Sequence, residues 1–234
     1  MKCVILQPSY IPWRGYFDQI KKSDLFVFFD DVQYDKRGWR NRNQIKTSIG
    51  KQWLTIPVHS KGAQTNHLLI KDVHVSYESN TLWTVDHWKS LQHAYARAPY
   101  FKEVMALLEP FYQQKPDFLA DFIIDLSIAI ARYIGITQTE FIRSSALDAQ
   151  GAKTDRLIDI LKKVGATLYI SGPSAQDYIE NDKFADAGIG LEYMDYTYPE
   201  YPQLYPPYDP FVSIVDLLMM TGKDSLNFFM EETH

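Results

Sequence analysis

Short apolar runs flank a helical stripe at the start of the chain. Residues 2–7 are an apolar run that ends before Pro8, and residues 24–30 are a second one. Between them, residues 14–22 carry apolar side chains on one stripe and close on two lysines. Runs of this length predict buried strands, and the stripe predicts a helix. The order strand, helix, strand predicts a β-α-β unit with parallel strands.

The same alternation returns in the second half of the chain. It predicts strands over 140–145, 167–172 and 191–196, and helices over 152–165, 174–188 and 211–222, with a short tail helix after the last. Together with the N-terminal unit, these segments predict an α/β fold. Its core is expected to be a Rossmann-like, nucleotidyltransferase-like parallel sheet.

Two segments with other periods interrupt this pattern. Residues 44–58 alternate on both sides of a turn near Gly50, which predicts an inserted β-hairpin, and residues 68–77 predict one more strand. Amphipathic stretches then predict a helical block, in which Pro110 kinks or ends the second helix. We expect one domain over 1–234, with an α/β core from 1–80 and 136–196, a helical insertion over 81–135, and a C-terminal Tyr/Pro loop with helices over 197–234.

Composition narrows the classes of protein that the chain can belong to. The 234 residues carry a formal net charge of −5, which gives no reason to expect a nucleic-acid partner. No apolar run approaches the roughly 20 residues of a membrane span, and no signal peptide is visible. We therefore expect a cytoplasmic protein without a membrane partner. The single cysteine, Cys3, and histidines without metal-ligand spacing predict no metal site. A homodimer stays open.

A rigid aromatic loop follows the first predicted strand. Pro8 and Pro12 fix the backbone between this strand and the helix. The carboxyl edge of a parallel sheet and the N-terminus of a helix are the usual places for an anionic ligand in such folds. The candidate ligand-binding residues here are Gln7, Tyr10, Trp13, Arg14 and Gly15. The alternative is a packed aromatic turn without a ligand.

A polar and basic segment follows the second predicted strand. Arginine suits two-pronged contacts with phosphate or carboxylate, amides add neutral donors and acceptors, and an indole can stack on a base or sugar. The candidate ligand-binding residues are Arg37, Trp39, Arg40, Asn41, Arg42 and Asn43. Asp30, Asp31 and Lys36 are the candidate catalytic residues, with an aspartate as general base. The alternatives are a solvated basic loop and aspartates that only cap or form ion pairs.

A third candidate lies at the end of the strand predicted over 167–172. Ser171 and Ser174 offer hydroxyls, Gly172 permits a tight turn, and the helix expected next offers its N-terminus to an anion. If the sheet is continuous, this loop and the loop after the first strand lie on the same edge. Simple N-capping is the alternative.

One local segment resembles a known group of enzymes. Class I nucleotidyltransferases carry a His-x-Gly-His motif at a helix start, where this chain reads Trp13-Arg14-Gly15-Tyr16. The glycine is kept, and both histidines, which stabilise charge on the phosphates of the transferred nucleotide, are absent. The resemblance implies a similar architecture and puts ordinary adenylyl transfer in doubt.

A second resemblance covers nearly the whole chain. The segments "QPSYIPWRGYFDQI", "LQHAYARAPYF", "YISGPSAQDY" and "YPQLYPPYDPFVSIVDLLMMTG" occur in this order and are similar to the WbqC-like family. That family is widespread in bacteria and is often associated with surface-polysaccharide (O-antigen, lipopolysaccharide) gene sets. The resemblance implies a role in modifying a nucleotide-linked amino sugar by an acyl or aminoacyl group. It supplies no catalytic residues to carry over.

Three classes of function therefore stay open. The first is a transferase acting on a phosphorylated or nucleotide-linked small molecule, with no cofactor assigned and a nucleotide as the one candidate. The second is an ATP-dependent nucleotidyltransferase or ligase in which Arg14 and Tyr16 replace the histidines, and its mark is the release of pyrophosphate. The third is a non-catalytic binding subunit with its Tyr/Pro-rich segment over 193–211 as partner surface.

Overall fold

Five parallel strands form the central sheet of the computed structural model, which describes residues 1–61, 67–78, 82–177 and 179–229. The strands are β1 (Lys2–Leu6), β2 (Leu25–Phe28), β5 (Glu140–Arg143), β6 (Leu168–Ser171) and β7 (Gly190–Tyr193), and they lie in the order β5-β2-β1-β6-β7. Taken along the chain, that is the 3-2-1-4-5 order of Rossmann-like folds. The predicted α/β fold with a Rossmann-like core is confirmed.

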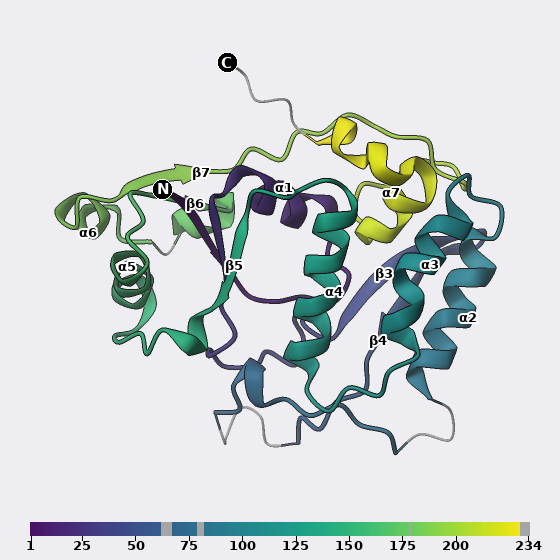
Figure 1. The fold of residues 1–234 in the computed structure, drawn as a ribbon, viewed down its shortest axis with the longest axis horizontal. Coiled ribbons are helices and arrows are strands. Elements are labelled where there is room, and N and C mark those ends of the chain that lie inside the picture. The colour runs from purple at the N-terminus through teal and green to yellow at the C-terminus, as the bar shows by residue number, and fades with distance from the viewer. Residues whose placement is uncertain (62–66, 79–81, 178, 230–234) are drawn as a thin grey trace.

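Helices cover both faces of this sheet (Figure 1). Alternate residues of β1 point to opposite faces, so Cys3 and Ile5 join one core cluster and Val4 joins the other. The first cluster includes α5 (Lys153–Lys163) and α6 (Asn181–Asp186). The second includes α1 (Arg14–Lys22) and α4 (Leu119–Tyr133). Because both faces are covered, the three central strands β1, β2 and β6 are largely apolar, as is usual for parallel sheets.

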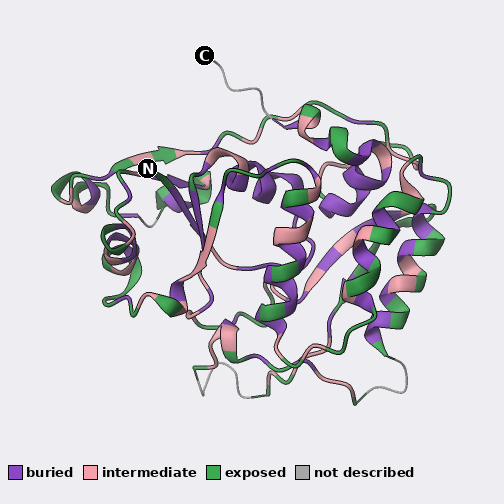
Figure 2. Ribbon diagram, in the orientation of Figure 1, coloured by how far each residue is buried: buried purple, intermediate pink, exposed green. Residues whose placement is uncertain are grey.

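The inserted elements and the C-terminal helix pack on the side of α1 and α4. They are the hairpin β3 (Arg42–Thr47) and β4 (Gly50–Thr55), the helices α2 (Trp83–Tyr95) and α3 (Phe101–Tyr112), and the C-terminal α7 (Ile214–Thr221). Side chains from all five elements share one core cluster with the sheet. In Figure 2, α1 and α7 are buried around most of their surface, while α2 and α3 bury one side each.

The expected strand over 68–77 is not a strand. The segment contains the short 3₁₀ helix Ile70–Asp72, and its burial does alternate around Val73 and Val75. Its backbone bonds, however, go to separate segments, with Ile70 N–H donating to the Val32 carbonyl and Val75 N–H to the Asp117 carbonyl. The burial of this segment therefore alternates although its backbone pairs with no single neighbouring strand. Residues 62–66, which precede the segment, lie outside the described ranges.

The helix expected over 174–188 is broken into two short pieces. Pro173–Asp177 is a 3₁₀ turn, and α6 begins only at Asn181. Ile179 packs into the core, and Glu180 N–H donates to Thr154 Oγ1 instead of continuing a helical ladder. A 3₁₀ turn of five residues provides no helix N-terminus for an anion, so that part of the expectation is wrong. Residue 178, residues 79–81 at the start of the helical block and residues 230–234 at the end of the chain are not described.

Candidate functional site

The loops after β1 and β6 lie side by side at the carboxyl edge of the sheet. The two strands pair in parallel, with Cys3 opposite Tyr169, so Gln7 and Ser171 both stand where these neighbouring strands end. The chain crosses from β1 to β2 on one side and from β6 to β7 on the other. This point, where the strand order reverses, is where open α/β sheets bind their ligands.

A cavity of about 550 Å³ opens at this point. Its walls come from the loop after β1, the N-terminal half of α1, the segment before β3, the loop after β6 and the C-terminal segment. Eight predicted site residues line it: Gln7, Trp13, Trp39, Arg40, Asn43, Ser171, Gly172 and Ser174. The size is within the range of small-molecule sites, and the lining mixes aromatic surface with a few polar groups, as such sites do.

Arg40 is the one charged side chain among the described residues that line the cavity. Its Nη1 donates to Gln7 Oε1 at 2.6 Å, and its buried Nε has no hydrogen-bond partner among the described residues. No ion pair joins Arg40 to a carboxylate within the described part of the chain. Burial lowers the pKa of the guanidinium, and the nearby Tyr16 and Asp35 oppose that shift. A guanidinium is not deprotonated in proteins, so Arg40 keeps its charge.

Asn43 holds the backbone of the loop after β1 in place. Its Nδ2 donates to the carbonyl oxygens of Tyr10 at 3.1 Å and Ile11 at 2.9 Å. The Tyr10 N–H in turn donates to the Arg40 carbonyl at 3.1 Å, so the loop and the basic segment are tied in both directions. The sequence separates these residues by about thirty positions, and the hairpin brings them together.

Trp13 covers the start of α1 with its indole ring. A Cβ added at Gly15 would lie 2.4 Å from Trp13 Cζ2, so the glycine makes room for the ring. The ring also meets Tyr196 edge to face, with centroids 4.9 Å apart. Gln19 Nε2 donates to the Tyr196 hydroxyl at 2.8 Å. Gly15 therefore acts through Trp13 and is not itself part of the cavity lining.

Besides Gly15, six predicted binding or catalytic residues from the two N-terminal loops lie outside the lining. The Tyr10 hydroxyl points to the helical block and bonds His87 Nδ1 and Tyr112. Arg14 binds the C-terminal segment, through the carbonyl oxygens of Pro199 and Phe228 and the Tyr208 hydroxyl. The Asn41 side chain donates from Nδ2 to the Ile56 carbonyl oxygen, and the Arg42 guanidinium lies over the Trp53 ring. The last two residues of this group, Lys36 and Arg37, are exposed.

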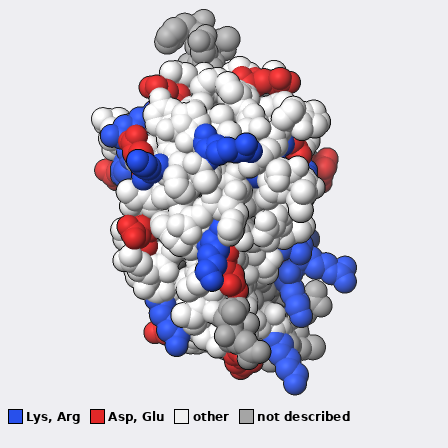
Figure 3. Space-filling view, turned by 90° about the vertical axis from the view of Figure 1, so that its right-hand side faces the viewer, with Lys and Arg blue, Asp and Glu red and all other residues white. Residues whose placement is uncertain are grey.

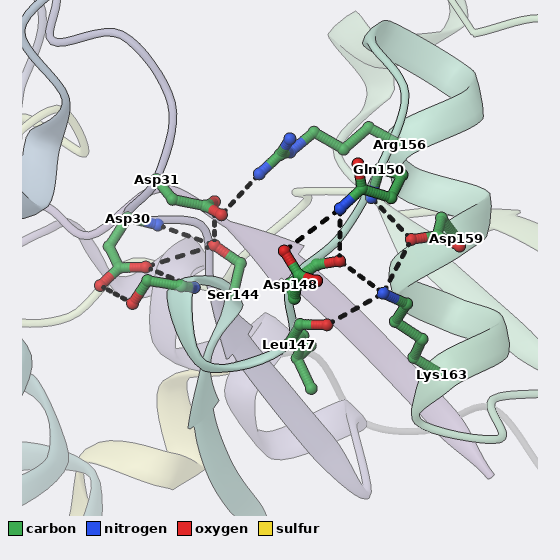
Figure 4. Close-up of polar contacts among 10 residues, drawn as sticks. Asp30, Asp31, Ser144, Leu147, Asp148, Gln150, Arg156, Asp159 and Lys163 are labelled. Carbon is green, nitrogen blue, oxygen red and sulfur yellow. Dashed lines mark hydrogen bonds and ion pairs between the residues drawn. The ribbon is translucent and has the colours of Figure 1, made fainter.

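Asp30 and Asp31 belong to a separate polar cluster where β2 and β5 end (Figure 4). Asp30 accepts hydrogen bonds from Ser145 N–H at 3.1 Å and Ser145 Oγ at 2.9 Å and is fully buried. Asp31 accepts from Ser144 Oγ and from Arg156 Nη2, each at 2.5 Å. Neither carboxylate lines the cavity. The cluster joins β2 to the turn after β5 and to α5.

Several lining residues were not among the main candidates of the sequence analysis. On α1, Tyr16, which was named only for the alternative ligase, and Gln19 continue the spacing of three residues from Trp13, so helical periodicity points to both. Both carry a buried polar atom, Tyr16 Oη and Gln19 Oε1, that has no partner among the described residues. Tyr196 and Phe211 come from the C-terminal segment, and no local signal places them at the cavity.

The charges on one face of the molecule are shown in Figure 3, where basic side chains lie among acidic ones and a larger uncharged surface. Among the described residues, no group of three or more His, Cys, Asp or Glu has a geometry that could hold a metal ion. Nor is any helix in that part of the chain long and apolar enough to cross a bilayer.

Comparison with known proteins places the chain in a family. The profile of the WbqC-like protein family matches residues 7–228, and the chain belongs to that family. A protein of Mycobacterium tuberculosis named "Uncharacterized protein Rv1507c" is 39% identical over 229 residues, which cover 97% of this chain and 96% of the relative. No solved structure matches the chain. The resemblance of the sequence to the WbqC-like family is therefore confirmed.

Proposed function

We propose that the cavity binds a phosphorylated small molecule and that the protein is a transferase acting on it. The observation that carries this proposal is the charge of the lining, where Arg40 stands without a carboxylate. A half-buried cation that forms no ion pair within the described residues favours an anionic ligand. Arginine presents its donors as a fork that suits phosphate, and carboxylate to a similar degree.

Neutral groups complete the contacts that a phosphate ester requires. Ser171, at the end of β6, and Ser174, in the turn that follows, offer hydroxyls to the same cavity. Tyr16 stays a hydrogen-bond donor because burial raises its pKa well above the ordinary value. Amide groups of Gln7 and Gln19 can bind hydroxyl or amino groups on the rest of the ligand.

Family membership suggests a reaction in surface-polysaccharide biosynthesis. We propose transfer of an acyl or aminoacyl group to the amino group of a nucleotide-linked or phosphorylated sugar. The amine nitrogen attacks the acyl carbonyl, the activating group leaves with the bonding electron pair, and the amine gives one proton to solvent water. The cavity positions the reactants while Arg40 binds the phosphate, and the Tyr16 hydroxyl is a suitable donor for the developing oxyanion. Asp30 and Asp31 lie outside the lining, and the proposal gives them no step.

A binding subunit is the second candidate, and one observation favours it. No Asp, Glu, His, Lys or Cys side chain is among the described residues that line the cavity, so none of these side chains is placed there as a general base. Such a protein would hold its ligand unchanged through long incubation. The ATP-dependent ligase is less favoured, because Arg14 binds the C-terminal segment instead of the cavity.

The proposal is tested by a thermal-shift screen of phosphorylated sugars, nucleotides, nucleotide sugars and acyl carriers. A ligand at a hundred times its dissociation constant adds about 2.7 kcal/mol of stability, a shift of several degrees. The shift is expected to disappear in Arg40→Ala and to fall in Arg40→Lys. Arg37→Ala removes the same charge from an exposed side chain outside the lining and is the matched control. Equal shifts in all three variants would falsify the proposed site, and product formed by the wild type separates the transferase from the binding subunit.

A further inference from the structure

Two large aromatic side chains are left exposed beside the cavity. Trp39 is 48% exposed and Phe211 is 71% exposed, and both are among the lining residues. Apolar groups of this size gain about 25 cal/mol for each Å² that is removed from water, so folding alone favours their burial. Exposed apolar surface at the mouth of a cavity is typical of a binding surface.

Trp53 of the hairpin contacts the Trp39 ring. The rings of Trp39 and Trp53 have centroids 5.3 Å apart and planes 33° apart. The Arg42 guanidinium lies 4.7 Å from the Trp53 ring centroid and donates to the Arg37 carbonyl at 2.7 Å. Trp39 and Arg42 therefore both pack on Trp53, and of the three only Trp39 lines the cavity.

The pairing of the hairpin explains how this stack is built. Gln44 is opposite Trp53, so Arg42, two residues earlier on β3, is the diagonal neighbour of Trp53 on the same face. The other face carries Asn43, Ile45 and Leu54, which are buried. One face of the hairpin thus joins the core, and Trp53 on the other face contacts the Trp39 ring.

Trp39 and Arg40 are consecutive, yet their side chains reach different partners. Arg40 extends to Gln7 at the end of β1, while the Trp39 ring packs on Trp53 of β4. Their backbone is held by the Tyr10 N–H, which donates to the Arg40 carbonyl. An anion-binding group and a stacking surface therefore lie next to each other at one cavity. A ligand that uses both carries a planar ring close to its phosphate.

We propose that Trp39 stacks on the nucleobase of the ligand, so that the substrate class is a nucleotide or nucleotide-linked molecule and not a simple sugar phosphate. This inference rests on the proposed function, since it places the phosphate at Arg40. Aromatic side chains stack on any base, because every base has a π-face. Trp39 therefore contributes affinity for the base but does not select one base over another.

The test compares ligands that share one phosphomonoester and differ in the ring. Binding of uridine 5′-monophosphate, adenosine 5′-monophosphate and N-acetylglucosamine 1-phosphate is measured by calorimetry in wild type, Trp39→Ala, Trp39→Phe and Arg40→Ala. Trp39→Ala is expected to weaken both nucleotides by about tenfold to a hundredfold and to leave the sugar phosphate unchanged. Trp39→Phe keeps a ring, so it should retain most nucleotide affinity. Thermal melting confirms that each variant is folded.

The outcomes separate this inference from the proposed function. Nucleotide binding that depends on Arg40 but not on Trp39 overturns the inference and leaves the phosphate site intact. Equal losses for all three ligands in Trp39→Ala also overturn it, because they assign Trp39 to a sugar face or to the shape of the site. A wild-type protein that binds none of the three overturns the proposed site together with the inference.

Discussion

The carbonyl oxygen of Ile11 accepts a hydrogen bond from the side-chain amide of Asn43 at 2.9 Å. Ile11 is buried and has a φ of 36°, a backbone conformation that is unfavourable for a β-branched residue. A second bond to the same oxygen, from Ser213 Oγ at 2.8 Å, fixes it from the other side. The loop at the cavity is thus held in a strained shape by contacts from the hairpin and the C-terminal segment.

Asn43→Ala should weaken both folding and ligand binding. The substitution removes the donor to the carbonyl oxygens of Tyr10 and Ile11, which costs about 1–3 kcal/mol of stability. Because the loop lines the cavity, ligand affinity should fall as well. Asn41→Ala is the matched control, since Asn41 also bonds a backbone carbonyl but does not line the cavity. Denaturant unfolding and calorimetry measure the two effects, and equal losses of affinity would contradict this role of Asn43.

Gly15→Ala should disturb the cavity although alanine favours helices. Alanine is better than glycine in a helix by about 1 kcal/mol, but its Cβ would meet the Trp13 indole at 2.4 Å. The ring must move, and ligand affinity should decrease severalfold. In a Trp13→Ala background the same change meets no ring and should leave affinity unaffected and raise stability. Binding and melting of the two single variants and the double variant give the coupling; additive effects would rule out the contact.

The fold could be predicted to a large extent because its signals are local. Apolar runs such as Leu25–Phe28 and the stripe of α1 follow from periodicity, and the parallel order follows from their alternation. The segment around Ile70 shows the limit. Its burial alternates like that of a strand, but the partners that decide between a strand and single bridges come from distant segments.

The site could be predicted only in part, for a similar reason. Gln7, Arg40 and Ser171 could be placed together because parallel strands end on one edge. Arg14 could not be separated from them by sequence, because its partners Tyr208 and Phe228 are nearly 200 residues or more away in the chain. Helix orientation directs Arg14 to the C-terminal segment and Tyr16 to the cavity.

Asp30→Asn should affect stability more than binding. Asp30 Oδ2 accepts from Ser145 Oγ, and Oδ1 accepts from the Ser145 N–H, so an amide in its place turns one acceptor into a donor. Loss of charged hydrogen bonds costs about 1.5–3 kcal/mol. Ligand affinity should be unchanged, as the residue is outside the lining. If the variant instead keeps its stability and loses group transfer, the prediction of Asp30 as general base is upheld over the structural role.

His87 should make the protein less stable as the pH falls below neutrality. Its Nδ1 is bonded to the Tyr10 hydroxyl at 2.9 Å, and burial lowers the pKa of the imidazole to about 4. The unfolded chain takes up this proton near a pKa of about 6.5. Between pH 6.5 and 4 the unfolded state therefore binds more protons than the folded state. The free energy of unfolding should decrease as the pH is lowered through this range, by about 3 kcal/mol at most from His87.

Two variants isolate the contribution of His87 to that slope. His87→Gln should lower stability at pH 7 through lost packing and should flatten the decrease between pH 6.5 and 4. His93→Gln, an exposed position on the same helix, should leave the decrease as it is. Denaturant unfolding at pH 7, 5.5 and 4.5 gives the three slopes. A wild-type slope that His87→Gln retains in full would assign the pH dependence to other groups, because the glutamine cannot take up the proton.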